Sequence, residues 1–209
     1  MQHKPYGPYE KYFKRPLDLL CGIIAVIIFS WLYLALSILG LIFMRGNPFF
    51  TQARPGKNGQ VFMLIKFRTM DNRKDKDGNL LPDEVRLNRY GRFLRKVSLD
   101  EIPEAFNIIK GDMSLIGPRP LLVQYLPLYS EAQMHRHDVR PGLSGYAQVN
   151  GRNSITWTHR FELDCEYVNK ITFLGDLKII IQTVEKAFIK REGISSATSD
   201  TMEDFDGTN

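Results

Sequence analysis

Cysteine and histidine are scarce in this sequence, and neither forms the pattern of a metal site. The 209 residues contain two cysteines, Cys21 and Cys165, which lie far apart, and four histidines without zinc-ligand spacing. This excludes a disulfide framework and suggests a reducing compartment. The sequence also lacks a phosphate-loop motif, a dinucleotide-binding fingerprint and an internal repeat. Any nucleotide must therefore be bound in another way.

The charge balance is modestly basic. There are 28 Lys and Arg against 23 Asp and Glu, which gives a formal net charge of +5. Such a balance fits anionic lipid, a nucleotide or nucleic acid equally well. The length suits one sizeable domain with an appendage.

One long apolar run occupies residues 17–44, and its only charged residue is Asp18. As a straight helix rising about 1.5 Å per residue, it would reach roughly 40 Å, more than the hydrocarbon core of about 30 Å. It is too long for a signal-peptide core, and no small-residue cleavage site follows it. The run therefore predicts a membrane segment.

Basic residues flank this run on both sides. They are Lys11, Lys14 and Arg15 before it, and Arg45, Arg54 and Lys57 after it. The positive-inside tendency draws both flanks to the cytoplasm, which a re-entrant helix satisfies and a straight span does not. Ser30 lies near the middle, where its hydroxyl can satisfy a freed carbonyl at a bend, although Trp31 and not proline follows. A straight span remains the alternative.

Residues 98–101 (SLDE) predict the start of a helix. Ser98 with Glu101 forms a capping-box pattern, but Pro103 fits the helix better if Asp100 is the cap. In either case Asp100 lies at a helix N-terminus, where the dipole favours its ionised form, and Gly111 ends the helix. Neighbouring carboxylates splay by about 100° on a helix. We therefore expect one to attack or bind metal and the other to move a proton.

Arg119 lies between Pro118 and Pro120, which hold its backbone extended. A guanidinium fixed in this way suits a phosphate group. Arg95 and Arg152 are further candidates, the first just before the carboxylate pair and the second after an Asn-Gly turn. Several arginines near one carboxylate suit a pyrophosphate, and a hard cation such as Mg²⁺ needs only one or two carboxylates plus phosphate oxygens.

The motifs together resemble one known family, the bacterial sugar transferases, in its small monotopic phosphoglycosyl transferase form. The matching stretches are residues 14–18 (KRPLD), 50–56 (FTQARPG), 66–70 (KFRTM), 98–101 (SLDE), 110–114 (KGDMS), 117–120 (GPRP), 140–142 (RPG) and 150–152 (NGR). They run in family order from about residue 11 to residue 190. Among the minimal members, the chain looks closest to those that transfer diacetylbacillosamine phosphate in bacterial N-glycan assembly.

The resemblance implies a reaction. A sugar 1-phosphate, with an N-acetylated amino sugar expected, passes from a UDP-sugar to a polyprenyl phosphate such as undecaprenyl phosphate, and UMP leaves. This is the first membrane step of glycoconjugate assembly. Asp100 would be the nucleophile that forms a phosphosugar ester and would share Mg²⁺ with the substrate phosphate, while Glu101 would assist. The expected phosphate- or substrate-binding residues are Arg119, Arg95, Arg152, Lys66 and Arg68.

The same resemblance implies an α+β fold that is mostly helical. Residues 1–46 would form a basic segment and a membrane helix, re-entrant in the family, where the break reads Ser-Pro. Residues 47–192 would form a membrane-surface catalytic domain with short strands and amphipathic helices. Residues 193–209, rich in Ser, Thr and Asp, read as a disordered tail. We expect the catalytic domain on the cytoplasmic face of the bacterial inner membrane, in contact with lipid and not with nucleic acid, and a homodimer is allowed.

Within the catalytic domain, the apolar pattern predicts a strand over residues 61–65 and helices over 84–97, 157–168 and 174–191. The last helix packs on the core or rests on the membrane surface. Tyr125, Gln148, Asn150 and Trp157 can line a sugar pocket, but they do not select a sugar. Two alternatives stay open: a transferase with another lipid acceptor, and a non-catalytic membrane adaptor that would not need Asp100.

Overall fold

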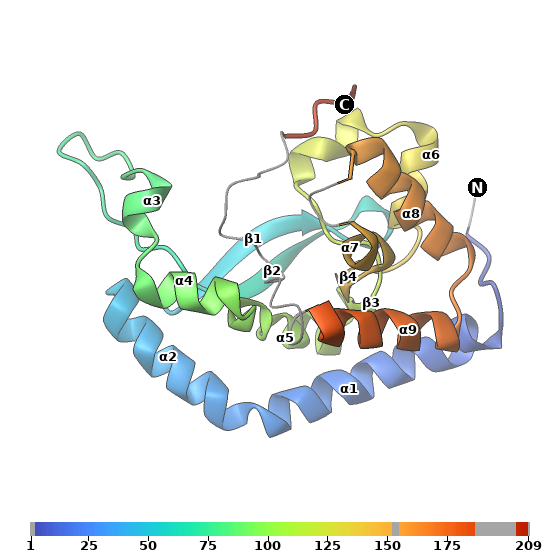
Figure 1. Cartoon of the computed structure of the whole chain (residues 1–209), viewed down its shortest axis with the longest axis horizontal. Coiled ribbons are helices and arrows are strands. Elements are labelled where there is room, and N and C mark those ends of the chain that lie inside the picture. Colours follow the sequence, from blue (N-terminus) through green and yellow to red (C-terminus); the bar gives the residue numbers. More distant parts are fainter. Residues whose placement is uncertain (1–2, 152–154, 187–203, 209) are drawn as a thin grey trace.

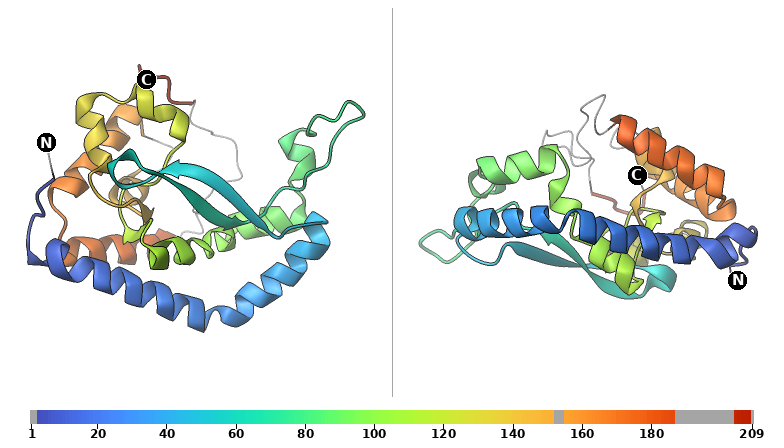
Figure 2. Two further views of the ribbon diagram at one scale, coloured as in Figure 1. Left: turned by 180° about the vertical axis from the view of Figure 1, so that it is seen from behind. Right: turned by 90° about the horizontal axis from the view of Figure 1, so that it is seen from below.

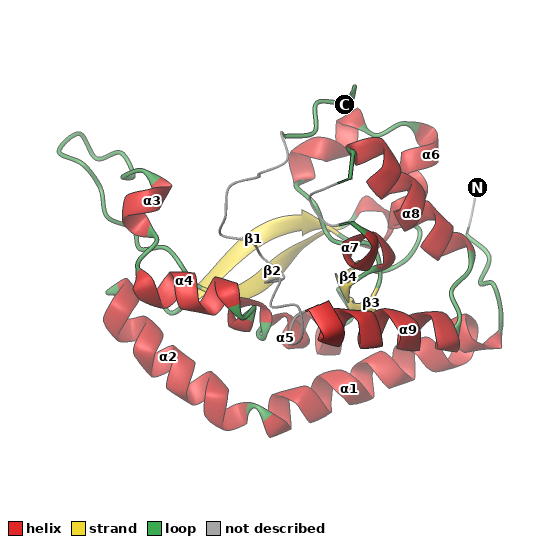
Figure 3. Ribbon diagram, in the orientation of Figure 1, coloured by secondary structure: helices red, strands yellow, loops and turns green. Residues whose placement is uncertain are grey.

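The computed structural model describes residues 3–151, 155–186 and 204–208. Within these residues the fold is α+β and mostly helical, as expected, with four short strands (Figure 3). The elements in chain order are a π-helical turn Tyr9–Phe13, α1 Lys14–Ile28, α2 Ser30–Met44, β1 Phe49–Pro55, β2 Val61–Phe67, α3 Asp83–Arg86, α4 Arg89–Lys96, α5 Glu104–Lys110, β3 Ser114–Ile116, α6 Glu131–Met134, β4 Gly142–Ser144, α7 Tyr146–Asn150, α8 Trp157–Asn169 and α9 Phe173–Val184.

The apolar run folds as two helices, α1 and α2, which meet in an open V along one edge of the molecule (Figure 1). Within the described residues no single helix is long and apolar enough to cross a membrane. Tyr9–Ile28 and Ser30–Met44 meet the length and composition test only as a pair, and they are bent by 63°. The straight helix that the sequence left open is therefore not formed.

The bend lies at Phe29, whose backbone leaves the helical region at φ −92° and ψ 10°. The amide of Phe29 still donates to the Ala25 carbonyl, and the amide of Tyr33 donates to the Phe29 carbonyl, each at 2.9 Å. Within the described residues the Ser30 hydroxyl makes no hydrogen bond, so its expected role at the bend was wrong.

Polar contacts hold α1 against the rest of the domain. The Asp18 carboxylate accepts from the Ser114 hydroxyl at 2.7 Å and from the Leu115 amide at 3.1 Å. Arg15 donates to the Ile108 carbonyl near the end of α5 at 2.6 Å. The one acidic residue of the apolar run is therefore buried and satisfied, which offsets the cost of taking its charge out of water.

Close packing holds α2. Tyr33 donates to the Ile102 carbonyl at 2.6 Å, just after the carboxylate pair. Gly40 allows a close approach, because a Cβ there would lie 2.7 Å from the Pro48 Cβ. Contacts to the domain thus hold both α1 and α2 in place, and these contacts fix the bend.

The face of the V that points away from the domain is apolar. Its exposed side chains are Leu20, Ile23, Ile24, Ile27, Ile28, Phe29, Trp31, Leu34, Ile38, Leu41, Ile42 and Phe43. An exposed apolar surface of this extent marks a membrane or protein interaction site. In the view from below in Figure 2, α4 and α9 lie to one side of the α1–α2 pair, and β1 and β2 lie to the other.

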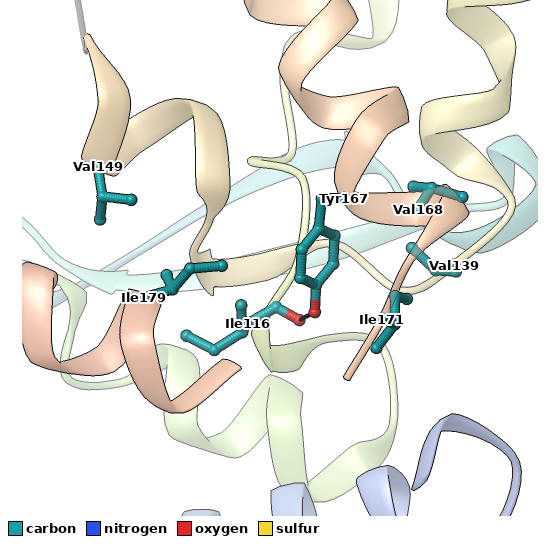
Figure 4. Close-up of a cluster of buried hydrophobic side chains, with 7 residues drawn as sticks. All are labelled: Ile116, Val139, Val149, Tyr167, Val168, Ile171 and Ile179. Atoms are coloured by element: carbon teal, nitrogen blue, oxygen red, sulfur yellow. Dashed lines mark hydrogen bonds between the residues drawn. The ribbon is translucent and has the colours of Figure 1, made fainter. Parts of the chain in front are cut away.

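Two small sheets and one apolar cluster organise the domain. β1 and β2 form an antiparallel hairpin, and β3 pairs in parallel with β4. The strand predicted for residues 61–65 is confirmed as part of β2. The cluster drawn in Figure 4 joins β3 to α8 and α9 and contains Ile116, Val139, Val149, Tyr167, Val168, Ile171 and Ile179. The Tyr167 hydroxyl donates to the Ile116 carbonyl at 3.0 Å and thereby ties α8 to β3.

A second cluster is aromatic and includes a residue from the C-terminal stretch. It contains Leu121, Tyr125, Tyr129, Trp157, Phe161 and Phe205. Phe205 is only 3% exposed, and the neighbouring Asp204 accepts from the Tyr125 hydroxyl at 2.9 Å. The expectation of disorder is therefore wrong for this residue, because its ring fills an aromatic core. Of the expected tail, residues 193–203 and 209 lie outside the described residues.

The helix predicted for residues 84–97 is two helices, α3 and α4. Leu87 and Asn88 leave the helical region, and the Asn88 side chain caps α4 by accepting from the Gly91 amide at 2.9 Å. The helix predicted for 157–168 is confirmed as α8. The helix predicted for 174–191 is confirmed as far as α9 is described, and its expected end at residue 191 lies outside the described residues.

Candidate active site

The carboxylate pair lies in a short 3-10 helix before α5 and not in the first turn of α5 itself. Ser98 adopts a left-handed conformation with φ 55°, and a 3-10 turn, Leu99–Glu101, follows it. Ser98 forms no side-chain cap, and α5 begins only at Glu104, after Pro103. Both capping interpretations were therefore wrong. Gly111 ends α5 with φ 100°, as expected.

Asp100 is almost fully buried, at 5% exposure. Within the described residues its Oδ1 atom has no hydrogen-bond partner. Burial raises the pKa of the Asp100 carboxyl, the neighbouring Glu101 raises it further, and the charges of Lys66 and Arg95 oppose this. The expectation that a helix dipole favours its ionised form was therefore wrong, because the turn separates Asp100 from the start of α5 and desolvation dominates.

Glu101 is also buried and is held by two cations. Its Oε1 atom accepts from Lys66 Nζ at 2.8 Å and from Arg119 Nη2 at 2.9 Å. Burial acts to raise the pKa of Glu101, but the charges of Arg119 and Lys66 outweigh it and lower the pKa to about 2. Glu101 is therefore ionised at neutral pH and serves as the anchor of both cations.

Lys66 also approaches a third carboxylate, because its Nζ lies 3.1 Å from Glu104 Oε1. Burial and the charge of Glu101 raise the pKa of Glu104 to about 7. The pKa values of the two glutamates are thus shifted in opposite directions, and within the described residues Arg119 pairs with Glu101 and not with Glu104. One anion and two cations form the stable part of this cluster.

Arg119 is held from both ends. Its guanidinium pairs with Glu101, and its carbonyl accepts from Arg136 Nη2 at 2.7 Å. Arg136 is fully buried and also pairs with Asp164 at 2.8 Å. The Arg119 side chain remains one third exposed, at 33%. The flanking prolines and Arg136 together leave this guanidinium fixed and still accessible to a ligand.

Two further arginines lie close to Arg119, and the sequence interpretation had not taken them as site residues. Burial and then the charge of Arg119 lower the pKa of Arg54 to about 10, and the Arg54 Nε atom is buried without a hydrogen-bond partner within the described residues. Burial and Arg119 also lower the pKa of Arg160, whose guanidinium lies 4.7 Å from the Trp157 ring. Arg54 lies within a stretch that matched the family, so the sequence could have identified it as a site residue. No pattern in the sequence marked Arg160.

The remaining predicted site residues are placed as follows. Arg95 donates to the Thr69 hydroxyl at 3.0 Å and lies near enough to Asp100 to lower its pKa. The Arg68 side chain makes no hydrogen bond or ion pair to any described residue. Arg152 lies outside the described residues. The structure therefore brings Lys66, Arg95 and Arg119 to the carboxylate pair, whereas it shows no such contact for the Arg68 side chain among the described residues.

The residues suggested for a sugar pocket have structural contacts. Tyr125 and Trp157 pack edge to face with ring centroids 5.7 Å apart in the aromatic core. Gln148 donates to the Leu143 carbonyl at 3.4 Å, and Asn150 donates to the Tyr146 carbonyl at 2.8 Å. These contacts do not identify a sugar.

The fit of this site to Mg²⁺ depends on Asp100. Within residues 3–151, 155–186 and 204–208, no group of three or more His, Cys, Asp or Glu side chains could hold a metal. Mg²⁺ does not need such a cage, because it binds through one or two carboxylates together with substrate phosphates and water. The unpartnered Oδ1 atom of Asp100 is a suitable ligand of this kind. The residues therefore fit a cation that is shared with a bound phosphate.

Taken together, the site offers a desolvated carboxylate oxygen beside a cluster of fixed cations. Such cations attract and orient phosphate oxygens, and their charges balance those of a pyrophosphate. A carboxylate with a free oxygen can act as a nucleophile toward the phosphorus atom of a phosphate held in this way. The arrangement thus suits phosphoryl transfer.

Comparison with known proteins agrees with this chemistry. The family model for bacterial sugar transferases matches residues 9–190. The chain is 50% identical over 191 residues to the uncharacterized sugar transferase EpsL of Bacillus subtilis (strain 168), covering 91% of each chain. It is 35% identical to the UDP-N-acetylgalactosamine-undecaprenyl-phosphate N-acetylgalactosaminephosphotransferase of Aeromonas hydrophila, covering 85% of this chain and 44% of that protein. It is 34% identical to the UDP-glucose:undecaprenyl-phosphate glucose-1-phosphate transferase of Klebsiella pneumoniae, covering 90% of this chain and 42% of that protein.

Proposed function

This chain belongs to the bacterial sugar transferase family, and we propose that it transfers a sugar 1-phosphate from a UDP-sugar to a polyprenyl phosphate, releasing UMP. Two relatives support the proposal, since their names specify undecaprenyl phosphate as the acceptor. The observation that carries it is the free Oδ1 atom of buried Asp100 beside the Lys66–Glu101–Arg119 cluster. An adaptor that only binds lipid needs no such oxygen.

The proposed reaction has two displacement steps. Asp100 Oδ1 attacks the phosphorus atom that carries the sugar, the bond from that phosphorus to the UMP oxygen breaks, and UMP leaves with the bonding electrons. An oxygen of the polyprenyl phosphate then attacks the same phosphorus, and the bond to Asp100 breaks. The carboxylate of Asp100 is restored, and the product is a polyprenyl diphosphate sugar.

The cations have distinct roles in this proposal. Arg119, supported by Arg54 and Arg160, binds the pyrophosphate of the donor. Lys66 and Arg95 flank the carboxylate pair and attract the phosphate that Asp100 attacks. A Mg²⁺ ion held by Asp100 and the phosphates would supply further charge neutralisation.

We assign Glu101 a positioning role and not that of a proton donor. Its pKa of about 2 keeps it ionised at neutral pH. Its contacts to Lys66 and Arg119 orient these two cations toward the phosphate. A phosphate anion attacks without first losing a proton, so the second step requires no base at Glu101, and UMP leaves as an anion, so the first step requires no acid there.

The bent pair α1–α2 suggests how the enzyme meets its lipid. We propose that residues 1–46 enter the membrane and return, which places both basic flanks on the cytoplasmic face of the bacterial inner membrane. The 63° bend and the apolar outer face of the V support this arrangement. UDP-sugars are cytosolic and polyprenyl phosphates are membrane lipids, so the two substrates meet at this surface.

The identity of the sugar stays a proposal. We propose an N-acetylated amino sugar as the donor group, and the two relatives are named for N-acetylgalactosamine and glucose. Neither name specifies diacetylbacillosamine. A donor panel must therefore include UDP-glucose and UDP-N-acetyl sugars, diacetylbacillosamine among them.

A UMP-release assay tests the function. The purified chain in detergent is given the donor panel, undecaprenyl phosphate and Mg²⁺, alongside Asp100→Asn and a matched surface control, Asp77→Asn, whose side chain is exposed. We expect metal-dependent release from wild type and Asp77→Asn, and none from Asp100→Asn. Undiminished UMP release by Asp100→Asn would show that Asp100 is not the nucleophile. Absence of both release and covalent labelling of Asp100 with every donor would favour the adaptor.

A further inference from the structure

An apolar pocket of about 220 Å³ has Glu101 of the carboxylate pair in its lining. Its other lining residues include Ser98, Leu115 and Leu143, together with Ile180 and Val184 of α9. Its walls are almost entirely apolar. A space that suits hydrocarbon thus lies beside Glu101, which contacts Lys66 and Arg119.

The pocket does not suit a sugar or a peptide, because both carry polar groups that need hydrogen-bond partners when buried. The hydroxyls near this wall are already engaged. Ser144 and Thr183 lie in mutual hydrogen-bond contact at 2.7 Å, and Thr183 also donates to the Ile179 carbonyl at 2.7 Å. A hydrocarbon chain has no such requirement.

A second apolar pocket, of about 120 Å³, lies beside the first, because Leu115, Ile116 and Ile180 line both pockets. Leu17 and Cys21 of α1 also line the second pocket, and α1 is the arm of the V whose outer face is apolar. In the view of Figure 1, α9 is drawn above α1. The linings of the two adjoining pockets therefore extend from Glu101 to α1, the helix proposed to enter the membrane.

We propose that these two pockets bind the phosphate-proximal isoprene units of the polyprenyl phosphate acceptor. The inference rests on the proposed function, which supplies an acceptor with an anionic head and an apolar chain. The head would face Lys66 and Arg119, and the chain would follow α9 to α1. An apolar cavity of about 150 Å³ holds one benzene molecule. By that measure the first pocket takes about one or two five-carbon units, and the rest of the chain lies in the bilayer.

Ile180 is the position that tests this route, because it lines both pockets. Ile180→Trp would fill the junction. Its neighbour Ile181 on the same helix is 59% exposed, so Ile181→Trp is a matched control that adds the same side chain to the outer face. Neither residue belongs to the cluster that handles phosphate.

Two assays distinguish an effect on acceptor binding from an effect on the reaction with the donor. Exchange of labelled UMP into the UDP-sugar without lipid reports the first displacement, and full turnover reports the KM for undecaprenyl phosphate. We expect Ile180→Trp to raise that KM by at least about tenfold, since displacing a few methylenes has this effect, and to leave UMP exchange within about twofold. Ile181→Trp should leave both within about twofold. An unchanged lipid KM in Ile180→Trp, or a raised KM for the UDP-sugar instead, would overturn the inference.

If Ile180→Trp loses UMP exchange as well, a photolabel on the wild-type chain decides. The probe is a polyprenyl phosphate with a diazirine on its second isoprene unit. Labelling of α9 near Ile180 or of β4 near Leu143 supports the route, whereas labelling confined to α1 and α2 overturns it. A wild-type chain that exchanges no UMP with any donor would count against the proposed function, and the photolabel would still report on the pocket.

Discussion

Asp100 and Glu101 are neighbours, yet replacing each with its neutral isostere should change stability in opposite directions. Glu101 is stabilised as an anion by Lys66 and Arg119. Those cations lower its pKa from an ordinary 4.5 to about 2, which corresponds to about 3 kcal/mol of folding free energy at pH 7. We expect Glu101→Gln to lose about this amount, because an amide cannot balance two cations.

Asp100→Asn should behave differently. The Asp100 carboxylate is buried, its Oδ1 atom has no partner within the described residues, and its pKa is raised. Its ionised form is therefore less stable in the folded chain than in the unfolded chain. The amide should leave the free energy of unfolding unchanged or raise it by on the order of 1 kcal/mol, while UMP release is lost.

The pH dependence of stability checks independently whether the folded chain stabilises the ionised form of Glu101. A carboxyl with a lowered pKa contributes its full stability above its unfolded value, near 4.5, and loses it as the pH falls toward 2. The loss of stability caused by Glu101→Gln should therefore shrink as the pH falls below about 4.5. Between pH 4.5 and 7 the difference also contains the Glu104 titration, because the charge of Glu101 contributes to the raised pKa of Glu104.

Urea denaturation in detergent micelles, followed by tryptophan fluorescence, measures these differences, since Trp157 is buried in the core. Asp77→Asn serves again as the exposed control. Equal stability of Glu101→Gln and wild type at pH 7 would refute the role of Glu101 as an anchor. A large loss of stability in Asp100→Asn would show that its carboxylate has a stabilising partner and is not held free for attack.

Three further outcomes are expected. Burial and the charge of Glu101 raise the pKa of Glu104 to about 7. The free energy of unfolding of wild type should therefore fall by about 3 kcal/mol relative to Glu104→Gln as the pH rises from 4.5 through 7 in denaturation curves. A difference that does not change with pH would contradict this prediction. Arg136→Met should lower the free energy of unfolding by about 3 to 5 kcal/mol, because it leaves Asp164 buried without its partner, and it should raise the KM for the UDP-sugar. Adding Asp164→Leu should restore the stability but not the KM. Phe205→Ala should lose about 3 kcal/mol in the same assay, whereas Thr208→Ala, at an exposed position, should change little.

Local sequence sufficed to nominate the candidate residues at the centre of the site. Asp100, Glu101 and Arg119 were identified as candidates because their residue types, proline neighbours and spacing are visible in a short stretch. The apolar run of residues 17–44 was equally readable, since composition and length set what it can bury. The strand β2 and the helix α8 followed from periodicity, which is a property of neighbouring residues.

The tertiary structure alone decided the electrostatics and the surroundings. Whether Asp100 is stabilised or destabilised as an anion depends on desolvation and on cations from β2 and α4, and a helix-dipole argument from sequence had the opposite sign. Arg54 and Arg160 join the site only because the fold brings β1 and α8 to Arg119. The bend at Phe29, the packing of Phe205 and the apolar route along α9 likewise arise from contacts between segments far apart in the chain. Periodicity and motif spacing are set by adjacent residues, whereas burial, charge pairing and pocket shape are sums over all neighbours in space, and those sums exist only after the chain has folded.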